Sequence, residues 1–233
     1  MQNTSPKITA HASDLLTRKE SHCQGAKLRK KIPRGAHAEW SSPSTRQSPV
    51  SLLSQQGKDR IPSLLPVRYD RMKVSPFTFL RGAAIVMAQD LASTPASGID
   101  VQSCGDCHLA NFGSYSSPEG VPVFDINDFD ETLKAPFEWD IKRLGTSLVL
   151  AGQENGLSSK AARDLAANMS LSYCEQMTRL AAMTPLQIWS ERIVLTASIA
   201  GFDEQTVRAS AETLLSGPLE SAQVHLGLLA SHG

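Results

Sequence analysis

Apolar residues recur at helical spacing over two long parts of the chain. From Phe77 to Leu91 they fall three or four positions apart, which predicts a helix with one apolar face. Ser75-Pro76 provides a capping residue and a proline at the first helical position of this segment. After residue 139 the same spacing, interrupted by Gly, Pro and Ser, predicts helices over 140–153, 159–182, 186–199 and 204–215. Shorter helices are predicted over 48–58 and 62–72.

The middle of the chain has a different pattern. Ile99-Asp100-Val101 begins a short apolar run that is typical of a strand. Two extended runs, 111–116 and 121–126, flank a Ser-Pro-Glu-Gly segment with the residues of a hairpin turn. The chain contains no internal repeat. We therefore predict a helix-dominated α+β fold, with a small sheet or hairpin packed among helices.

Charge is unevenly distributed along the chain. The 23 basic and 23 acidic residues cancel, but residues 1–35 hold eight bases and two acids, which leaves 15 bases and 21 acids in residues 36–233. We predict a basic, disordered arm over 1–35 and a single region over 36–233. A neutral chain excludes a surface devoted to nucleic acid, so only weak contact through the arm is expected.

Hydropathy and cysteine content bear on the compartment. No apolar run approaches the roughly 18 residues of a membrane-spanning helix, and residues 1–35 show no apolar segment of a secretory signal. The four cysteines are therefore expected to be reduced thiols. We expect a cytoplasmic protein that makes no contact with a membrane.

Candidate chemistry concentrates between residues 102 and 140. The stretch from Asp125 to Asp140 carries six carboxylates and one base, a composition that attracts a hard cation such as Mg²⁺. Asn111 follows Asp106 by five residues, and Asp125 ends the second run of the predicted hairpin. Protein kinases use this interval and this strand–turn–strand context for a base and two metal ligands. The pattern predicts Asp106 as the base and Asn111 and Asp125 as Mg²⁺ ligands, with ATP as the nucleotide and an unknown hydroxyl compound as the acceptor.

Longer motifs extend this interpretation. They are CGDCHLANFG from residue 104, FDINDFDET from 124, FEWDIKRL from 137, HAEW from 37, and the segment from Arg71 to Ala83. Together they resemble the bacterial domain of unknown function 2252 family, which is itself similar to aminoglycoside-type kinases with the loop His-Gly-Asp-x-His-x-x-Asn. The resemblance implies a kinase-like C-lobe arrangement whose hairpin carries the catalytic and metal loops. It also implies catalytic roles for Asp106 and His108, and it adds Asp128 to the metal ligands Asn111 and Asp125.

Three basic residues flank this region. Lys142 and Arg143 lie one turn into the helix predicted near Asp140, where they are expected to pair with the 125–130 loop or to contact nucleotide phosphates. Arg81 is expected to pair with one of the six acids rather than to bind an anionic ligand.

Two departures from the kinase pattern matter. Cys104 replaces the first histidine of the loop, a position that supports loop geometry more than chemistry. None of the 15 glycines is spaced Gly-x-Gly, and no Gly-Lys-Ser/Thr occurs. In the family a glycine-rich turn follows the acidic loop, whereas this sequence ends at Gly233. We therefore expect a domain truncated at its C-terminus, which argues against catalysis by this chain alone.

Two alternatives remain open. One is a non-catalytic, pseudokinase-like binding or regulatory domain in which the acidic loop is structural. The other is a c-type haem protein, because Cys104-x-x-Cys107-His108 matches the attachment motif. Haem is not expected, since such attachment usually takes place outside the cytoplasm and the family commonly has alanine in place of Cys107.

Overall fold

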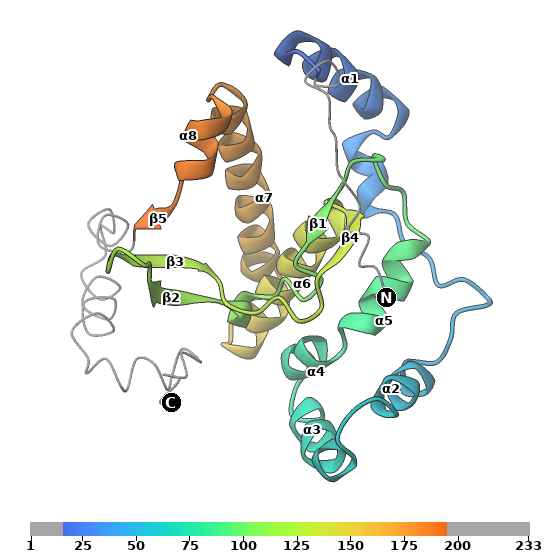
Figure 1. Cartoon of the computed structure of the whole chain (residues 1–233). Coiled ribbons are helices and arrows are strands. Elements are labelled where there is room, and N and C mark those ends of the chain that lie inside the picture. The colour runs from blue at the N-terminus through green and yellow to red at the C-terminus, as the bar shows by residue number, and fades with distance from the viewer. Residues whose placement is uncertain (1–15, 195–233) are drawn as a thin grey trace, which may run out of the picture.

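Helices dominate residues 16–194, which are the residues that this computed structural model describes (Figure 1). The α-helices are α1 (Arg18–Lys31), α2 (Pro49–Gly57), α3 (Leu65–Met72), α4 (Pro76–Gly82), α5 (Ala84–Ala92), α6 (Glu138–Glu154), α7 (Ser159–Ala181) and α8 (Pro185–Ser190). Short 3-10 helices are η2 (Arg34–Ala38), η3 (Pro62–Leu64) and η4 (Leu109–Asn111). The predicted helix-dominated α+β class is confirmed.

The helix predicted from Phe77 to Leu91 is in fact two helices. Ser75 begins α4 with a capping box to Thr78, as its sequence indicates. The backbone leaves helical geometry at Ala83, which is buried in a core made by Leu52, Leu53, Met72, Ala83 and Val86. Met72 packs so closely against Gly82 that a Cβ at this glycine would collide with it. The glycine thus allows α3 to approach closely at the point where the chain turns, although no proline marks the break.

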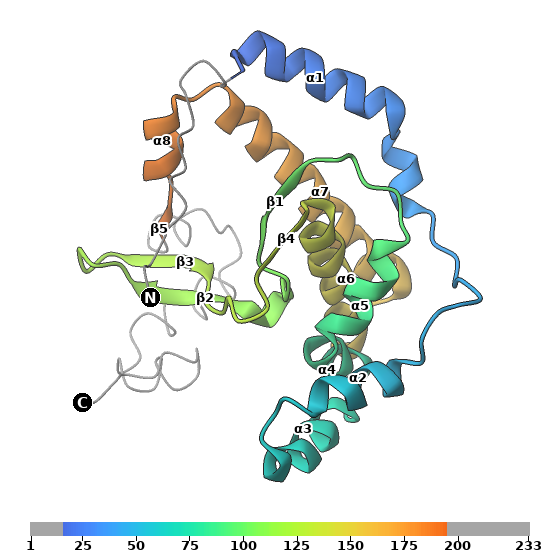
Figure 2. The ribbon, with the colours of Figure 1, turned by 45° about the vertical axis from the view of Figure 1, so that its right-hand side comes forward.

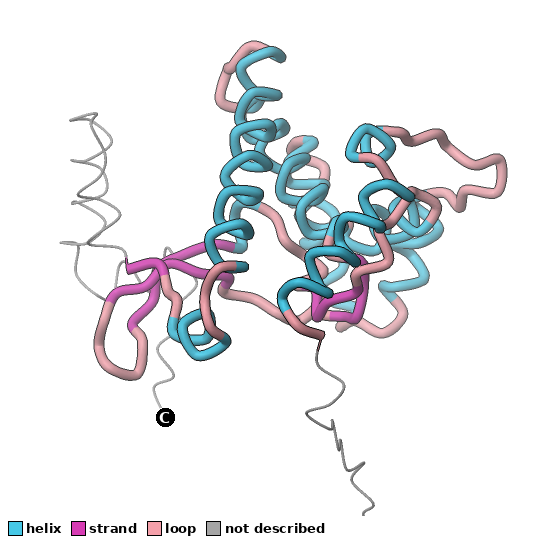
Figure 3. Tube along the Cα trace, turned by 90° about the horizontal axis from the view of Figure 1, so that it is seen from above, coloured by secondary structure: helices cyan, strands magenta, loops and turns pink. Residues whose placement is uncertain are grey.

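Strands form two separate antiparallel groups (Figure 3). β1 (Asp100–Ser103) pairs with β4 (Leu133–Pro136), with Val101 opposite Ala135. β2 (Phe112–Ser116) and β3 (Pro122–Ile126) form the predicted hairpin, with Gly113 opposite Asp125. The short strand β5 (Ile193–Val194) lies against β3. The sequence pattern did not predict β4 or β5.

α6 and α7 pack side by side behind the β1–β4 pair (Figures 1 and 2). Small residues allow this approach, since a Cβ at Gly152 would lie 3.3 Å from the Cβ of Ala162, which is fully buried. Both helices match their predicted ranges to within about two residues. The helix predicted over 186–199 ends at Ser190, and the one predicted over 204–215 lies outside residues 16–194.

The N-terminal arm differs from its prediction over residues 18–31. These residues form α1, which Thr17 and Glu20 begin with a capping box and whose last turn carries Arg29, Lys30 and Lys31. Cations at a helix C-terminus interact favourably with the helix dipole, which favours a helix despite the dense positive charge. α1 buries none of its residues, and residues 1–15 lie outside the described range.

None of the helices between residues 16 and 194 has the length and the hydropathy needed to cross a membrane.

Candidate active site around Asp106

One face of α6 holds the loop that carries Asp106. Asp140 accepts hydrogen bonds from the backbone N–H groups of Cys104 (2.8 Å) and Gly105 (3.1 Å). Arg143 binds the Asp106 carboxylate, and Ser147 accepts a hydrogen bond from the backbone N–H of Leu109 at 2.9 Å. Residues 140, 143 and 147 lie on the same side of a helix because they are three and four positions apart. α6 is therefore the support on which the loop is built.

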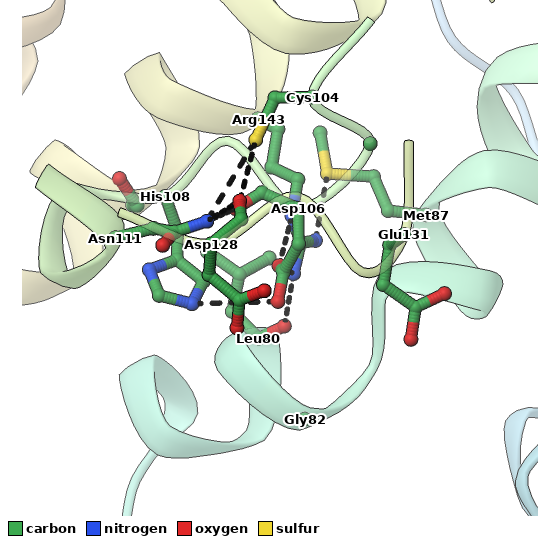
Figure 4. Close-up of polar contacts among 12 residues, drawn as sticks. Leu80, Gly82, Met87, Cys104, Asp106, His108, Asn111, Asp128, Glu131 and Arg143 are labelled. Carbon is green, nitrogen blue, oxygen red and sulfur yellow. Dashed lines mark hydrogen bonds and ion pairs between the residues drawn. The ribbon is translucent and has the colours of Figure 1, made fainter. Parts of the chain in front are cut away.

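Asp106 and Arg143 form an ion pair that is largely buried (Figure 4). Arg143 Nε lies 2.9 Å from Asp106 Oδ1, and Nη2 donates to the same oxygen and to the carbonyl of Leu80 at 2.7 Å. The Arg143 side chain is 3% exposed and that of Asp106 is 22% exposed. The expected pairing of Arg143 with the 125–130 loop is therefore wrong, because the guanidinium is paired with Asp106 instead.

Lys142 lies on a different face of α6. Its Nζ donates to Thr94 Oγ1 at 3.1 Å, and burial lowers the pKa of this lysine while Glu138 raises it. The expected pairing of Lys142 with the 125–130 loop is also wrong. Successive helix residues point about 100° apart, so Lys142 points to Thr94 while Arg143 points to the Asp106 loop.

His108 is a buried neighbour of Asp106. Its Nε2 lies 3.5 Å from Asp106 Oδ2, while Nδ1 is buried without a hydrogen-bond partner among the described residues. Burial lowers the pKa of His108; Asp106 raises it, and Arg143 and Arg81 lower it further. The imidazole is therefore neutral near pH 7 and borders the Asp106 oxygen that Arg143 does not bind.

Asn111 connects the Asp106 loop to the segment that follows the hairpin. Its Nδ2 donates to the backbone carbonyls of Asp106 (3.2 Å) and Asp128 (3.0 Å), and it lies 3.7 Å from Cys104 Sγ. The side chain is buried, so both carbonyls are held at one point. Because Nδ2 is used by these carbonyls, Oδ1 is the side-chain atom left to bind a cation.

The two candidate aspartates occupy different places. The backbone of Asp128 lies beside Asn111, which donates to its carbonyl. Figure 4 shows the carboxylates of Asp128 and Asp106 pointing toward the α4 segment that carries Leu80. Asp125 is exposed on β3, where its Oδ1 accepts from the backbone N–H of Ile126 at 2.8 Å. Asp128 is therefore the better placed of the two to act together with Asn111. In the described part of the chain, no three His, Cys, Asp or Glu side chains converge as a metal site.

Cys104 and Cys107 are both buried and free. The hydrogen bond between their thiols lowers the pKa of Cys104 and raises that of Cys107, and burial raises both. Cys104 Sγ also lies 3.6 Å from the backbone carbonyl of Asp128. Cys104, which replaces the kinase histidine, thus takes part in joining the Asp106 loop to Asp128.

A mainly apolar cavity of about 720 Å³ lies next to this site, between α4, α5 and α6. Leu80 and Met87 line it, and Arg143 contacts both, through the Leu80 carbonyl and at 3.7 Å from Met87 Sδ. Arg143 therefore lies between the cavity and Asp106.

Sequence reasoning missed Asp140 and Ser147 as supports of the loop. The signal was available, because Asp140, Arg143 and Ser147 have the spacing of one helix face directly after the acidic stretch. It also missed Glu138, which is buried, accepts from the backbone N–H of Ser97 at 2.9 Å and lies 3.9 Å from His37 Nε2.

The fold and the site together define a helix-rich α+β protein whose polar loop is fastened to a helix and joined to a hairpin by a buried asparagine. The chain belongs to a family of uncharacterized proteins conserved in bacteria (DUF2252), whose profile matches residues 60–225. This match confirms the family resemblance of the sequence motifs. No curated protein and no solved structure matches the chain, so the kinase-like arrangement stays a prediction.

Proposed function

We propose that the Asp106 site binds Mg²⁺–ATP and transfers a phosphoryl group to a hydroxyl acceptor. The observation that carries the proposal is the Asn111 amide, which holds the backbone of Asp106 and the backbone of Asp128 within 3.2 Å of one nitrogen. A base and two metal ligands at such a junction are what phosphoryl transfer requires of a protein, since catalysis is mainly positioning and charge stabilisation.

Mg²⁺ fits the donors that this site offers. Asn111 Oδ1 and the exposed carboxylate of Asp128 are hard oxygen ligands on the two segments that the Asn111 amide joins. Mg²⁺ commonly takes one or two carboxylates and completes its octahedron with water and phosphate oxygens, so a third protein carboxylate is not required. Bound there, the ion would neutralise charge on the phosphates. We propose Asp128, in place of Asp125, as the metal aspartate.

Asp106 has one carboxylate oxygen for proton transfer. Arg143 binds Oδ1 and fixes the carboxylate plane, whereas Oδ2 faces His108 and the side chain is partly exposed. In the proposed step the acceptor hydroxyl gives its proton to Asp106 Oδ2, and its oxygen bonds to the γ-phosphorus. The bond from that phosphorus to the bridging oxygen breaks, and its electron pair leaves with ADP.

Isothermal titration of the full chain with Mg²⁺–ATP tests the metal assignment. Asp128→Asn should weaken binding at least tenfold, because it removes the charged ligand. The matched control is Asp125→Asn, which changes an exposed aspartate three residues earlier, on β3, and should leave the affinity unchanged. Wild-type protein that does not bind Mg²⁺–ATP, or loss of binding in Asp125→Asn alone, would contradict the proposal.

A second candidate function is non-catalytic nucleotide binding. It is favoured by the Asp106–Arg143 ion pair, because the guanidinium already occupies one oxygen of the carboxylate that transfer would use as a base. Comparing ATP consumption by wild type and Asp106→Asn separates the two. Mg²⁺–ATP binding with no Asp106-dependent turnover supports the binding function, whereas turnover that Asp106→Asn abolishes supports transfer.

A further inference from the structure

Arginines surround the C-terminal end of α4, next to Asp106. Arg68 donates to the backbone carbonyl of Gly82 at 2.6 Å, and Arg143 donates to that of Leu80 at 2.7 Å. Arg81 lies between these two carbonyls on the chain. Its side chain is exposed and has no hydrogen bond or ion pair with any other described residue, so the acidic partner expected for it is not found within residues 16–194.

Arg60 approaches the same region from the segment before η3. Its Nη2 lies 3.3 Å from Glu131 Oε1, and its Nε is buried without a partner in the described part of the chain. Glu131 is adjacent to the Asp106 loop, since a Cβ at Gly105 would collide with the Glu131 backbone carbonyl. Arg60 therefore lies beside the Asp106 loop, where Glu131 contacts it.

Electrostatic effects agree with this placement. Burial lowers the pKa of Arg68, the charge of Arg60 lowers it further, and Glu131 and Asp106 raise it. Arg81 contributes to the lowered pKa of His108. The geometry places them near Asp106: Arg81 stands between the two carbonyls that Arg143 and Arg68 bind, and Arg60 reaches the loop through Glu131.

Arg143 is balanced by Asp106 and Arg60 by Glu131, whereas Arg68 and Arg81 have no carboxylate partner among residues 16–194. Asp128 is a further carboxylate that points toward α4 (Figure 4). Even with its charge counted, these local charges leave a positive excess. Arg68 is bound only by neutral oxygens, those of Gly82 and Gln56. One guanidinium group can donate two parallel hydrogen bonds to phosphate oxygens, and it stays charged at any physiological pH. A polyphosphate chain is the ligand that this excess fits best.

We infer that Arg60, Arg68 and Arg81 form a subsite for the phosphate chain of the nucleotide, beside Asp106. The inference rests on the proposed function and deepens it, because it names side chains that would hold the phosphate chain. Residues 1–233 contain no Gly-x-Gly spacing and no Gly-Lys-Ser/Thr. Arginine side chains are the groups among these residues that can supply positive charge to the phosphates.

Titration of the full chain with inorganic tripolyphosphate in the presence of EDTA tests the subsite without a metal. Arg81→Gln should weaken binding about tenfold, and its thermal unfolding midpoint should stay unchanged because Arg81 is exposed and has no hydrogen bond or ion pair within residues 16–194. Arg71→Gln is the matched control, since Arg71 is an exposed arginine on α3, the helix of Arg68, and should bind as wild type does. Binding should also weaken as salt is added. Absence of tripolyphosphate binding in wild type, or equal affinities of wild type and Arg81→Gln, would overturn the inference.

Asp128→Asn distinguishes this subsite from the metal site. It should weaken Mg²⁺–ATP binding at least tenfold and leave metal-free tripolyphosphate binding intact. If Asp128→Asn binds Mg²⁺–ATP like wild type while Arg81→Gln loses tripolyphosphate, the metal assignment fails and the phosphate subsite stands. If Arg81→Gln keeps tripolyphosphate while Asp128→Asn loses Mg²⁺–ATP, the subsite fails and the metal assignment stands.

Discussion

Replacing Arg143 by methionine is the most informative test of how the site is held together. Methionine fills most of the volume of the arginine stem but cannot donate a hydrogen bond. The change removes both contacts to Asp106 Oδ1 and the 2.7 Å hydrogen bond to the Leu80 carbonyl. It leaves Asp106 without its cation and disconnects the loop from the end of α4.

The size of the effect follows from burial. Breaking a buried ion pair by removing one partner costs about 3–5 kcal/mol, since the remaining charge is left uncompensated. Asp106 is 22% exposed and can recover some hydration, which places the expected loss at the lower end, about 3 kcal/mol. With a urea m-value of about 1–3 kcal/mol/M, the unfolding midpoint should fall by about 1 M or more.

The assay is equilibrium urea unfolding of wild type, Arg143→Met, Asp106→Asn and the double variant. In the double variant the orphaned carboxylate is gone, so its loss should be at least about 1 kcal/mol smaller than the sum of the two single losses. Arg163→Met, an exposed arginine on α7, serves as a control and should change stability by less than about 0.5 kcal/mol.

Two results would refute this reasoning. One is an Arg143→Met variant that loses less than about 1 kcal/mol, which would mean that the ion pair contributes little net stability. The other is additivity of the two single variants within about 0.5 kcal/mol, which would mean that Arg143 and Asp106 act independently.

Three further predictions concern the loop. Asp140→Asn should lower the free energy of unfolding by about 1–3 kcal/mol, because one of the two loop amides loses its acceptor. Glu175→Gln, which changes an exposed residue of α7, should leave that free energy unchanged. Equal losses for the two variants in urea unfolding would contradict this prediction. Gly105→Ala should lower the free energy of unfolding more than Gly120→Ala does. Both glycines have φ near +80°, but only a Cβ at 105 would meet a backbone carbonyl. A loss of about 1–2 kcal/mol is expected for Gly120→Ala, and an equal loss for both variants would contradict the close approach at Gly105. Burial lowers the folded-state pKa of His108, so the unfolded state binds more protons, and stability should fall as the pH drops below about 6.5. His108→Gln should make stability less dependent on pH between about 6.5 and 5, and an unchanged pH profile would refute the assignment.

Local patterns predicted much of the fold. The capping sequence at Ser75, the apolar spacing of α6 and α7 and the turn residues between β2 and β3 act within a few positions of the chain. β4 could not be predicted in the same way, because its four residues Leu-Lys-Ala-Pro show no clear alternation and are extended only through pairing with β1. The break at Ala83 likewise lies where Met72 of another helix packs against the chain, a contact that the local pattern does not contain.

The candidate site was predictable in its spacing but not in its partners. The interval from Asp106 to Asn111 correctly indicated a loop before a hairpin. Which aspartate lies beside Asn111 depends on how the chain leaves β3. The spacing predicted Asp125, and only the family resemblance added Asp128. The partner of Arg143 was not predicted. Six carboxylates lie near it in the sequence, whereas its actual partner, Asp106, lies 37 residues away.

The dependence of the Asp106 loop on α6 has a consequence for how the protein opens. Asp140, Arg143 and Ser147 hold the loop at three successive points, and the same helix binds Ser97 through Glu138 and Thr94 through Lys142. The segments before and within the site therefore form one cooperative unit with α6 rather than a loop that fluctuates on a fixed scaffold. The amide protons of Cys104, Gly105 and Leu109 should accordingly exchange with solvent at the rate at which α6 itself opens, far more slowly than those of an ordinary surface loop.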